Sequence, residues 1–128
     1  MTTDLTQASA DELGKLYRKG KASPVETMKA VLARADRLAT TINALCHVDA
    51  KAALAAARAS EKRWKKGEPL SPLDGVPVSI KELVRVKGWP ASMGSKLTDK
   101  TQVDADAPAV ARLREAGALV FAQSTSSE

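Results

Sequence analysis

The chain has 128 residues, a length that accommodates one ordinary domain but not two. Hydrophobic residues make up 44% and charged residues 27%, as in soluble globular domains, so a wholly disordered chain is excluded. The net charge of +5 is uneven, because residues 1–66 carry 13 Lys and Arg against 7 Asp and Glu. These cations recur through helical stretches without a glycine-aromatic element or zinc pattern, so no nucleic-acid partner is expected.

The cellular setting is constrained by what the sequence lacks. Cys46 is the only cysteine, which excludes an intrachain disulfide and favours a reducing compartment. The N-terminus has no basic segment followed by an apolar core, and no apolar run approaches the roughly 18 residues of a membrane span. We therefore expect a cytoplasmic protein with no membrane contact.

Two serines mark the starts of the first predicted helices. Ser9 and Glu12 form the pattern of a capping box, and Gly20 ends that short helix. Ser23 and Glu26 repeat the pattern with a proline at the first helical position. Apolar residues then recur at spacings of three and four, which predicts a helix ending near residues 40–41.

A second long helix follows a short connection. Residues 43–48 are predicted to be an extended connection or a strand. From Asp49 to about Lys66 the chain is rich in alanine, and Gly67 ends this helix. We expect the two long helices to pack as an antiparallel pair.

The second half carries the pattern of a βαβ unit. Residues 76–84 alternate as a strand does, residues 108–116 are amphipathic, and residues 118–122 form a continuous apolar run typical of a buried parallel strand. The fold class is therefore α/β. A helical arm over residues 1–66 precedes the start of a mixed, largely parallel sheet covered by helices over residues 73–128. A sheet that ends after so few strands indicates a truncated domain.

Lys81 is the one residue whose type does not match its apolar strand. Burial would push the pKa of its ammonium below about 10.4, and a neutral lysine is a competent base. The alternative is a lysine on a solvated strand face. Ser79 shares a face with Lys81 by the strand period, although a Ser-x-Lys pattern is common by chance.

Several segments resemble the amidase-signature family in the same order. Residues 74–82 read DGVPVSIKE, which is similar to the family's segment of Gly, hydrophobic, Pro, hydrophobic, any residue, hydrophobic, Lys and Asp. Residues 22–26, 42–44, 107–110 and 113–118, together with Lys87-Gly88 and Gly94-Ser95, also match pieces of the family. The resemblance extends from about Ser9 to Glu128, and the order of the pieces is more specific than any one of them.

The resemblance implies the lysine of a Ser-cisSer-Lys triad at Lys81. That lysine would accept a proton through a bridging serine from a nucleophilic serine, which attacks an amide carbonyl and forms an acyl-enzyme. Backbone N–H groups would hold the oxyanion, and water would release the acid. The resemblance implies a small-molecule amide substrate and no metal or cofactor.

The sequence departs from the family pattern in three places. Glu82 stands where aspartate is usual, and Ala122-Gln123 replaces a typical Gly-Lys. The Gly- and Ser-rich signature with both catalytic serines is missing. Ser124, Ser126 and Ser127 do not replace it, because no glycines surround them. We therefore expect the 128 residues alone to be inactive.

Other readings remain open. In the first, the chain is part of a free-standing amidase. In the second, it is part of the amidase-like subunit of a tRNA-dependent amidotransferase. In a third it is a non-catalytic helical module that binds a partner. Exposed sheet edges also leave a homodimer open. His47 beside Cys46 lacks the further ligands of a metal site. Trp89 is expected to pack in the core, or to line a substrate pocket of the complete enzyme.

Overall fold

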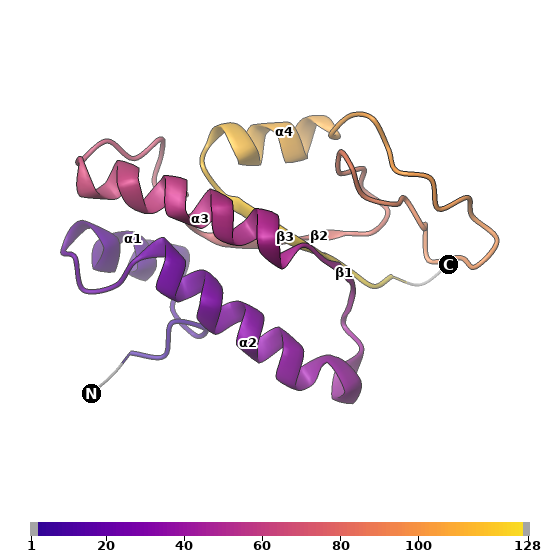
Figure 1. The fold of residues 1–128 in the computed structure, drawn as a ribbon, viewed down its shortest axis with the longest axis horizontal. Coiled ribbons are helices and arrows are strands. Elements are labelled where there is room, and N and C mark those ends of the chain that lie inside the picture. The colour runs from indigo at the N-terminus through magenta and orange to yellow at the C-terminus, as the bar shows by residue number, and fades with distance from the viewer. Residues whose placement is uncertain (1–2, 127–128) are drawn as a thin grey trace.

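A computed structural model describes residues 3–126 as an α/β fold (Figure 1). Residues 1, 2, 127 and 128 lie outside the described part. The elements follow one another as α1 (Ala10–Arg18), α2 (Pro24–Ile42), β1 (Leu45–Val48), α3 (Ala50–Lys65), β2 (Pro77–Lys81), α4 (Pro108–Glu115) and β3 (Leu119–Ser124).

The predicted helix starts are confirmed. Ser9 and Ser23 each accept a hydrogen bond from the backbone N–H three residues later, and the glutamate at that position accepts from the serine N–H in return. α2 ends at Asn43, which takes a left-handed conformation at the cap. α2 and α3 then lie alongside each other in opposite directions (Figure 1), as predicted for an antiparallel pair.

β3 is the central strand of a three-stranded mixed sheet with the order β1-β3-β2. It pairs in parallel with β2 and antiparallel with β1. The parallel pair with α4 between its strands confirms the βαβ unit. The sequence predicted either an extended connection or a strand over residues 43–48. The structure has a strand there, β1. β2 ends at Lys81, earlier than expected, because the chain turns there and the Val84 N–H donates to the Lys81 carbonyl at 2.9 Å.

The core lies in two layers, one on each face of the sheet. On one face Leu119 and Phe121 of β3 pack against Met28 of α2 and the alanines of α3. On the other face Val120 and Ile80 pack against Val110 of α4. The small side chains of α3, Ala53 and Ala57, are fully buried or nearly so, which lets this helix lie close to the sheet.

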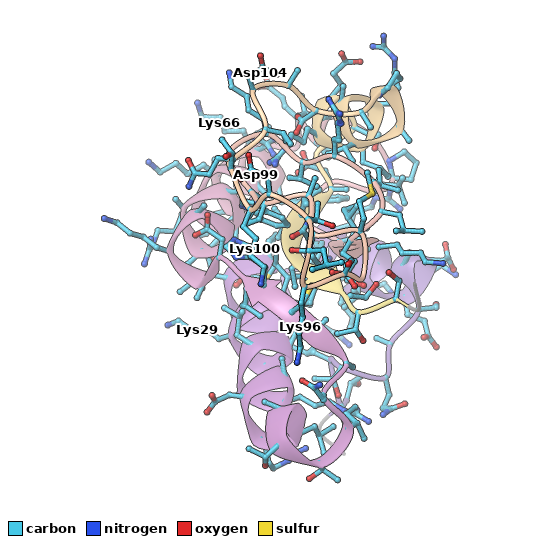
Figure 2. The ribbon with its side chains drawn as sticks, turned by 90° about the vertical axis from the view of Figure 1, so that its right-hand side faces the viewer. Lys29, Lys66, Lys96, Asp99, Lys100 and Asp104 are labelled. Atoms are coloured by element: carbon cyan, nitrogen blue, oxygen red, sulfur yellow. The ribbon has the colours of Figure 1, made fainter. Side chains whose placement is uncertain are left out.

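The segment between β2 and α4, residues 82–107, is irregular and extends past the end of the sheet (Figure 1). Figure 2 labels Lys96, Asp99, Lys100 and Asp104 along it. Trp89 folds back from this segment and is buried, with 5% exposed, among Val86 and Ile80. This confirms its expected role in packing. Among residues 3–126 no helix is long and apolar enough to cross a membrane.

Candidate functional site

A buried ion pair fixes the loop from which β2 emerges. The Asp74 side chain is fully buried and accepts hydrogen bonds from Arg63 Nε and Nη2, both at 2.7 Å, and from Ser60 Oγ at 2.6 Å. Burial alone would raise the pKa of Asp74, but the hydrogen bonds from Arg63 and Ser60 outweigh it and lower that pKa. Trp64 Nε1 also donates to the Asp74 carbonyl at 3.0 Å. α3 is thereby tied to the start of β2.

Gly75 lets the chain pass from this ion pair into the strand. Its φ is +84°, and an added Cβ would lie 2.7 Å from Pro24 Cγ and 2.8 Å from Ser60 Oγ. The Gly75 N–H donates to the Gly117 carbonyl at 3.0 Å, and its carbonyl accepts from Tyr17 Oη, also at 3.0 Å. The glycine of the DGVP segment is therefore required both for its backbone conformation and for close packing.

Lys81 lies at the other end of β2, at the carboxyl edge of the parallel pair. It is in register with Ser124, the last residue of β3. Lys81 is exposed, and so is Ser79 on the same strand. Within residues 3–126, the prediction that Lys81 is buried is therefore wrong. The residues of this strand that pack into the core are Val78 and Ile80. The carboxyl ends of parallel strands are where α/β folds place their ligand sites.

Glu82 follows Lys81 and is buried, with 5% of its surface exposed. Its Oε1 accepts from the Ser126 N–H at 2.8 Å and from Ser126 Oγ at 3.1 Å. The Cys46 thiol lies within hydrogen-bonding distance of Glu82 Oε2, at 3.6 Å, and of the Gln123 carbonyl, at 3.5 Å. The sequence did not indicate this cluster, because Cys46 and Glu82 lie 36 positions apart in the chain. The available signal was an acidic residue adjoining the candidate base.

Two serines near Lys81, Ser124 and Ser126, take part in hydrogen bonds at the strand ends. Ser124 accepts a hydrogen bond at its carbonyl from the Glu82 N–H at 3.0 Å, and Ser126 is held by the Glu82 carboxylate. Ser127 lies outside the described residues. Gln123 is 2% exposed, and its Nε2 has no hydrogen-bond partner among residues 3–126. It occupies the position where lysine was expected from the family pattern.

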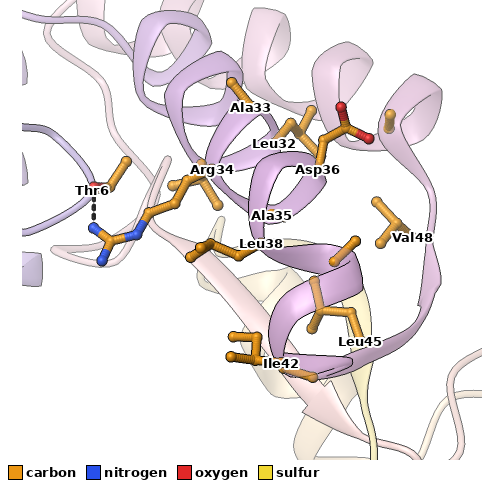
Figure 3. A pocket seen from close by; sticks show the side chains of 14 residues that line it. Thr6, Leu32, Ala33, Arg34, Ala35, Asp36, Leu38, Ile42, Leu45 and Val48 are labelled. Atoms are coloured by element: carbon orange, nitrogen blue, oxygen red, sulfur yellow. Dashed lines mark hydrogen bonds between the residues drawn. The ribbon is translucent and has the colours of Figure 1, made fainter.

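A sizeable cavity lies apart from Lys81, along α2 and β1 (Figure 3). It is a groove of about 670 Å³ whose walls are mainly aliphatic, with Leu38, Ile42 and Val48 among them. Of its polar side chains, Arg34 donates from Nη1 to Thr6 Oγ1 at 2.7 Å. The groove offers an apolar surface but no nucleophile paired with a base. No group of His, Cys, Asp and Glu able to hold a metal ion occurs in the described part of the chain.

Comparison with known proteins agrees with this arrangement of elements. The model of the Amidase family matches residues 26–128. The chain belongs to the amidase family. It is 40% identical over 126 residues to the A subunit of the glutamyl-tRNA(Gln) amidotransferase of Salinispora tropica, covering 98% of this chain and 26% of that relative.

Solved structures show the amidase fold directly. A crystal structure of an amidase matches 96% of this chain with 35% identity and a TM-score of 0.80, over 27% of its own length. The peptide amidase of Stenotrophomonas maltophilia matches 92% of this chain with 26% identity and a TM-score of 0.84, over 24% of its length. The chain therefore spans about a quarter of the amidases that it matches, and it corresponds to their N-terminal part.

Proposed function

We propose that this chain supplies the base lysine, Lys81, of an enzyme that hydrolyses the carbon–nitrogen bond of a small carboxylic amide. The observation that carries the proposal is the place of Lys81 in a member of the amidase family. It ends β2, in register with Ser124, at the edge of the parallel strands where a ligand is accessible.

The chemistry assigns one role to this chain. The side-chain amine of Lys81 accepts the proton that a bridging serine passes on from a nucleophilic serine. The nucleophile then forms an acyl-enzyme and the amine product leaves, after which water releases the acid. Neither role is assigned to Ser124 or Ser126, which take part in the hydrogen bonds at the strand ends.

The test is the substitution Lys81→Ala in the gene product at its native length. Removing a positioned general base lowers kcat by about 100-fold or more, with the fold unchanged by circular dichroism. Release of ammonia from a simple carboxamide is the readout. Lys100→Ala is the matched control, since Lys100 is exposed on the irregular segment. Activity of Lys81→Ala within about threefold of the parent would remove the proposal.

A second candidate is the amidase-like subunit of a tRNA-dependent amidotransferase. The 40% identity to the Salinispora tropica protein favours it. In this reading Lys81 has the same role, but glutamine is the amide donor and partner subunits are required. Co-purification of such a partner, and turnover that depends on charged tRNA, would separate it from a free-standing amidase.

The intact mass of the gene product from its native cell decides whether either enzyme can form. A mass several times 13.5 kDa supplies residues for the serines, and the tests above apply directly. A mass of 13.5 kDa leaves Lys81 without them and favours a helical module that binds a partner.

A further inference from the structure

The carboxylate of Glu82 connects three separate parts of the chain next to Lys81. Its two oxygens accept from Ser126, just after β3, and from Cys46 on β1. Its own backbone N–H continues the parallel ladder by donating to Ser124. All three strands are therefore connected through one residue, directly after the candidate base.

This carboxylate is held by hydrogen bonds rather than by a cation. Among residues 3–126 no Lys or Arg nitrogen lies within 4.0 Å of it. The Ser126 N–H lowers the pKa of Glu82 most, burial opposes this, and the Ser126 hydroxyl, the Cys46 thiol and the Gly94 backbone lower the pKa further. Hydrogen bonds to a buried, ionised carboxylate are stronger than those between neutral groups, so the contacts resist displacement.

The direction in which Lys81 projects depends on this arrangement. A side chain follows its Cα–Cβ bond, which the backbone of β2 sets at its last residue. On one side of Lys81 the strand is paired with β3, and on the other side its carbonyl closes a turn with Val84 at 2.9 Å. Glu82 is the side chain that locks this turn to the neighbouring strands.

We propose that Glu82 is a positioning residue for Lys81, holding the end of β2 against β1 and the segment after β3 so that the lysine amine keeps its working position. The inference rests on the proposed function. A misplacement of about 1 Å lowers the rate of a well-oriented reaction by about 100-fold, so a lock of this kind has a measurable effect.

The length of the Glu82 side chain lets one carboxylate contact both Ser126 and Cys46. Aspartate, usual in the family at this position, is shorter by one methylene. The carboxylate would then be drawn back towards the backbone, away from Ser126 and Cys46, which it contacts as glutamate. Glu82→Asp is therefore the conservative variant expected to rescue part of the function. Glu82→Gln keeps the shape and removes the charge.

The experiment compares Glu82→Gln, Glu82→Asp and Lys81→Ala in the gene product at its native length. Readouts are kcat, KM and the second-order rate constant with which a fluorophosphonate modifies the nucleophilic serine. That rate constant does not depend on the fraction of protein that is folded. We expect Glu82→Gln to lower kcat and the labelling constant by about 10- to 100-fold with KM within about twofold, and Glu82→Asp to lie between it and the parent. Glu68→Gln, an exposed glutamate, is the matched control.

The outcomes separate the two proposals. If Lys81→Ala is inactive while Glu82→Gln labels at the parental rate, the positioning role is overturned and the proposed function stands. If Glu82→Gln lowers the yield or kcat but leaves the fluorophosphonate rate constant unchanged, Glu82 only stabilises the fold. That result also overturns the positioning role. If Lys81→Ala remains active, the proposed function fails, and the role of Glu82 fails with it.

Discussion

Arg63 holds Asp74 through two hydrogen bonds of 2.7 Å, one to each carboxylate oxygen. Asp74 is fully buried, whereas the Arg63 side chain is 29% exposed. The pair joins α3 to the residue before the glycine that opens β2. The strand bearing Lys81 is therefore anchored at its start by an ion pair and at its end by Glu82.

Replacing Asp74 with asparagine should destabilise the protein by about 3 kcal/mol, because it leaves a guanidinium without its partner in a largely buried site. The free energy of unfolding from urea titration is the measurement. Asp11→Asn is the control, since Asp11 pairs with Lys15 on the surface, and no change in that free energy is expected. An unchanged midpoint for Asp74→Asn would show that the ion pair does not anchor the strand.

The Asp74 carboxylate should also make the free energy of unfolding depend on pH. Its pKa is lowered in the folded protein from the ordinary 3.8. The stability it contributes is therefore present in full above pH 3.8 and lost as pH falls through the lowered folded value. The difference in unfolding free energy between the parent and Asp74→Asn should be constant near neutral pH and shrink on acidification below about pH 4. A difference that grew in acid would contradict the assignment.

Gly75→Ala should cost about 3 kcal/mol, because it combines left-handed backbone strain with overlap against Pro24 and Ser60. Gly67→Ala is the matched control. Gly67 has a φ of +72°, but nothing lies within 4 Å of an added Cβ, so only the backbone strain of about 1 kcal/mol applies. Thermal unfolding of the two variants measures the steric part directly. Equal losses in both would mean that the close packing around Gly75 contributes nothing.

Cys46 should become more reactive when Glu82 loses its charge. Partial desolvation raises the pKa of the Cys46 thiol, and the negative charge of Glu82 raises it further. Glu82→Gln removes the second cause and lowers this pKa, so a larger fraction is thiolate at about pH 8. Alkylation by iodoacetamide, followed at the Cys46 peptide by mass spectrometry, should become faster by several-fold. Glu68→Gln should leave the rate unchanged.

The sequence by itself determined the helices and the βαβ unit. Ser9 and Ser23 marked the starts of their helices because a capping box is local, requiring only residues three positions apart. The continuous apolar run of β3 identified a strand covered on both faces, and the DGVP segment pointed to Lys81. Each of these signals depends on near neighbours in the chain.

The tertiary structure alone decided how distant residues meet. β1 lies next to β3 rather than next to β2, and this places Cys46 within reach of a glutamate 36 residues away. The exposure of Lys81 and the burial of Glu82 were likewise beyond the sequence, because a strand pattern shows which residues share a face but not which face is covered. Nothing in the sequence distinguished Asp74 and Arg63 from other charged residues or indicated that they pair. Their pairing required α3 to fold back onto the start of β2, which only packing fixes.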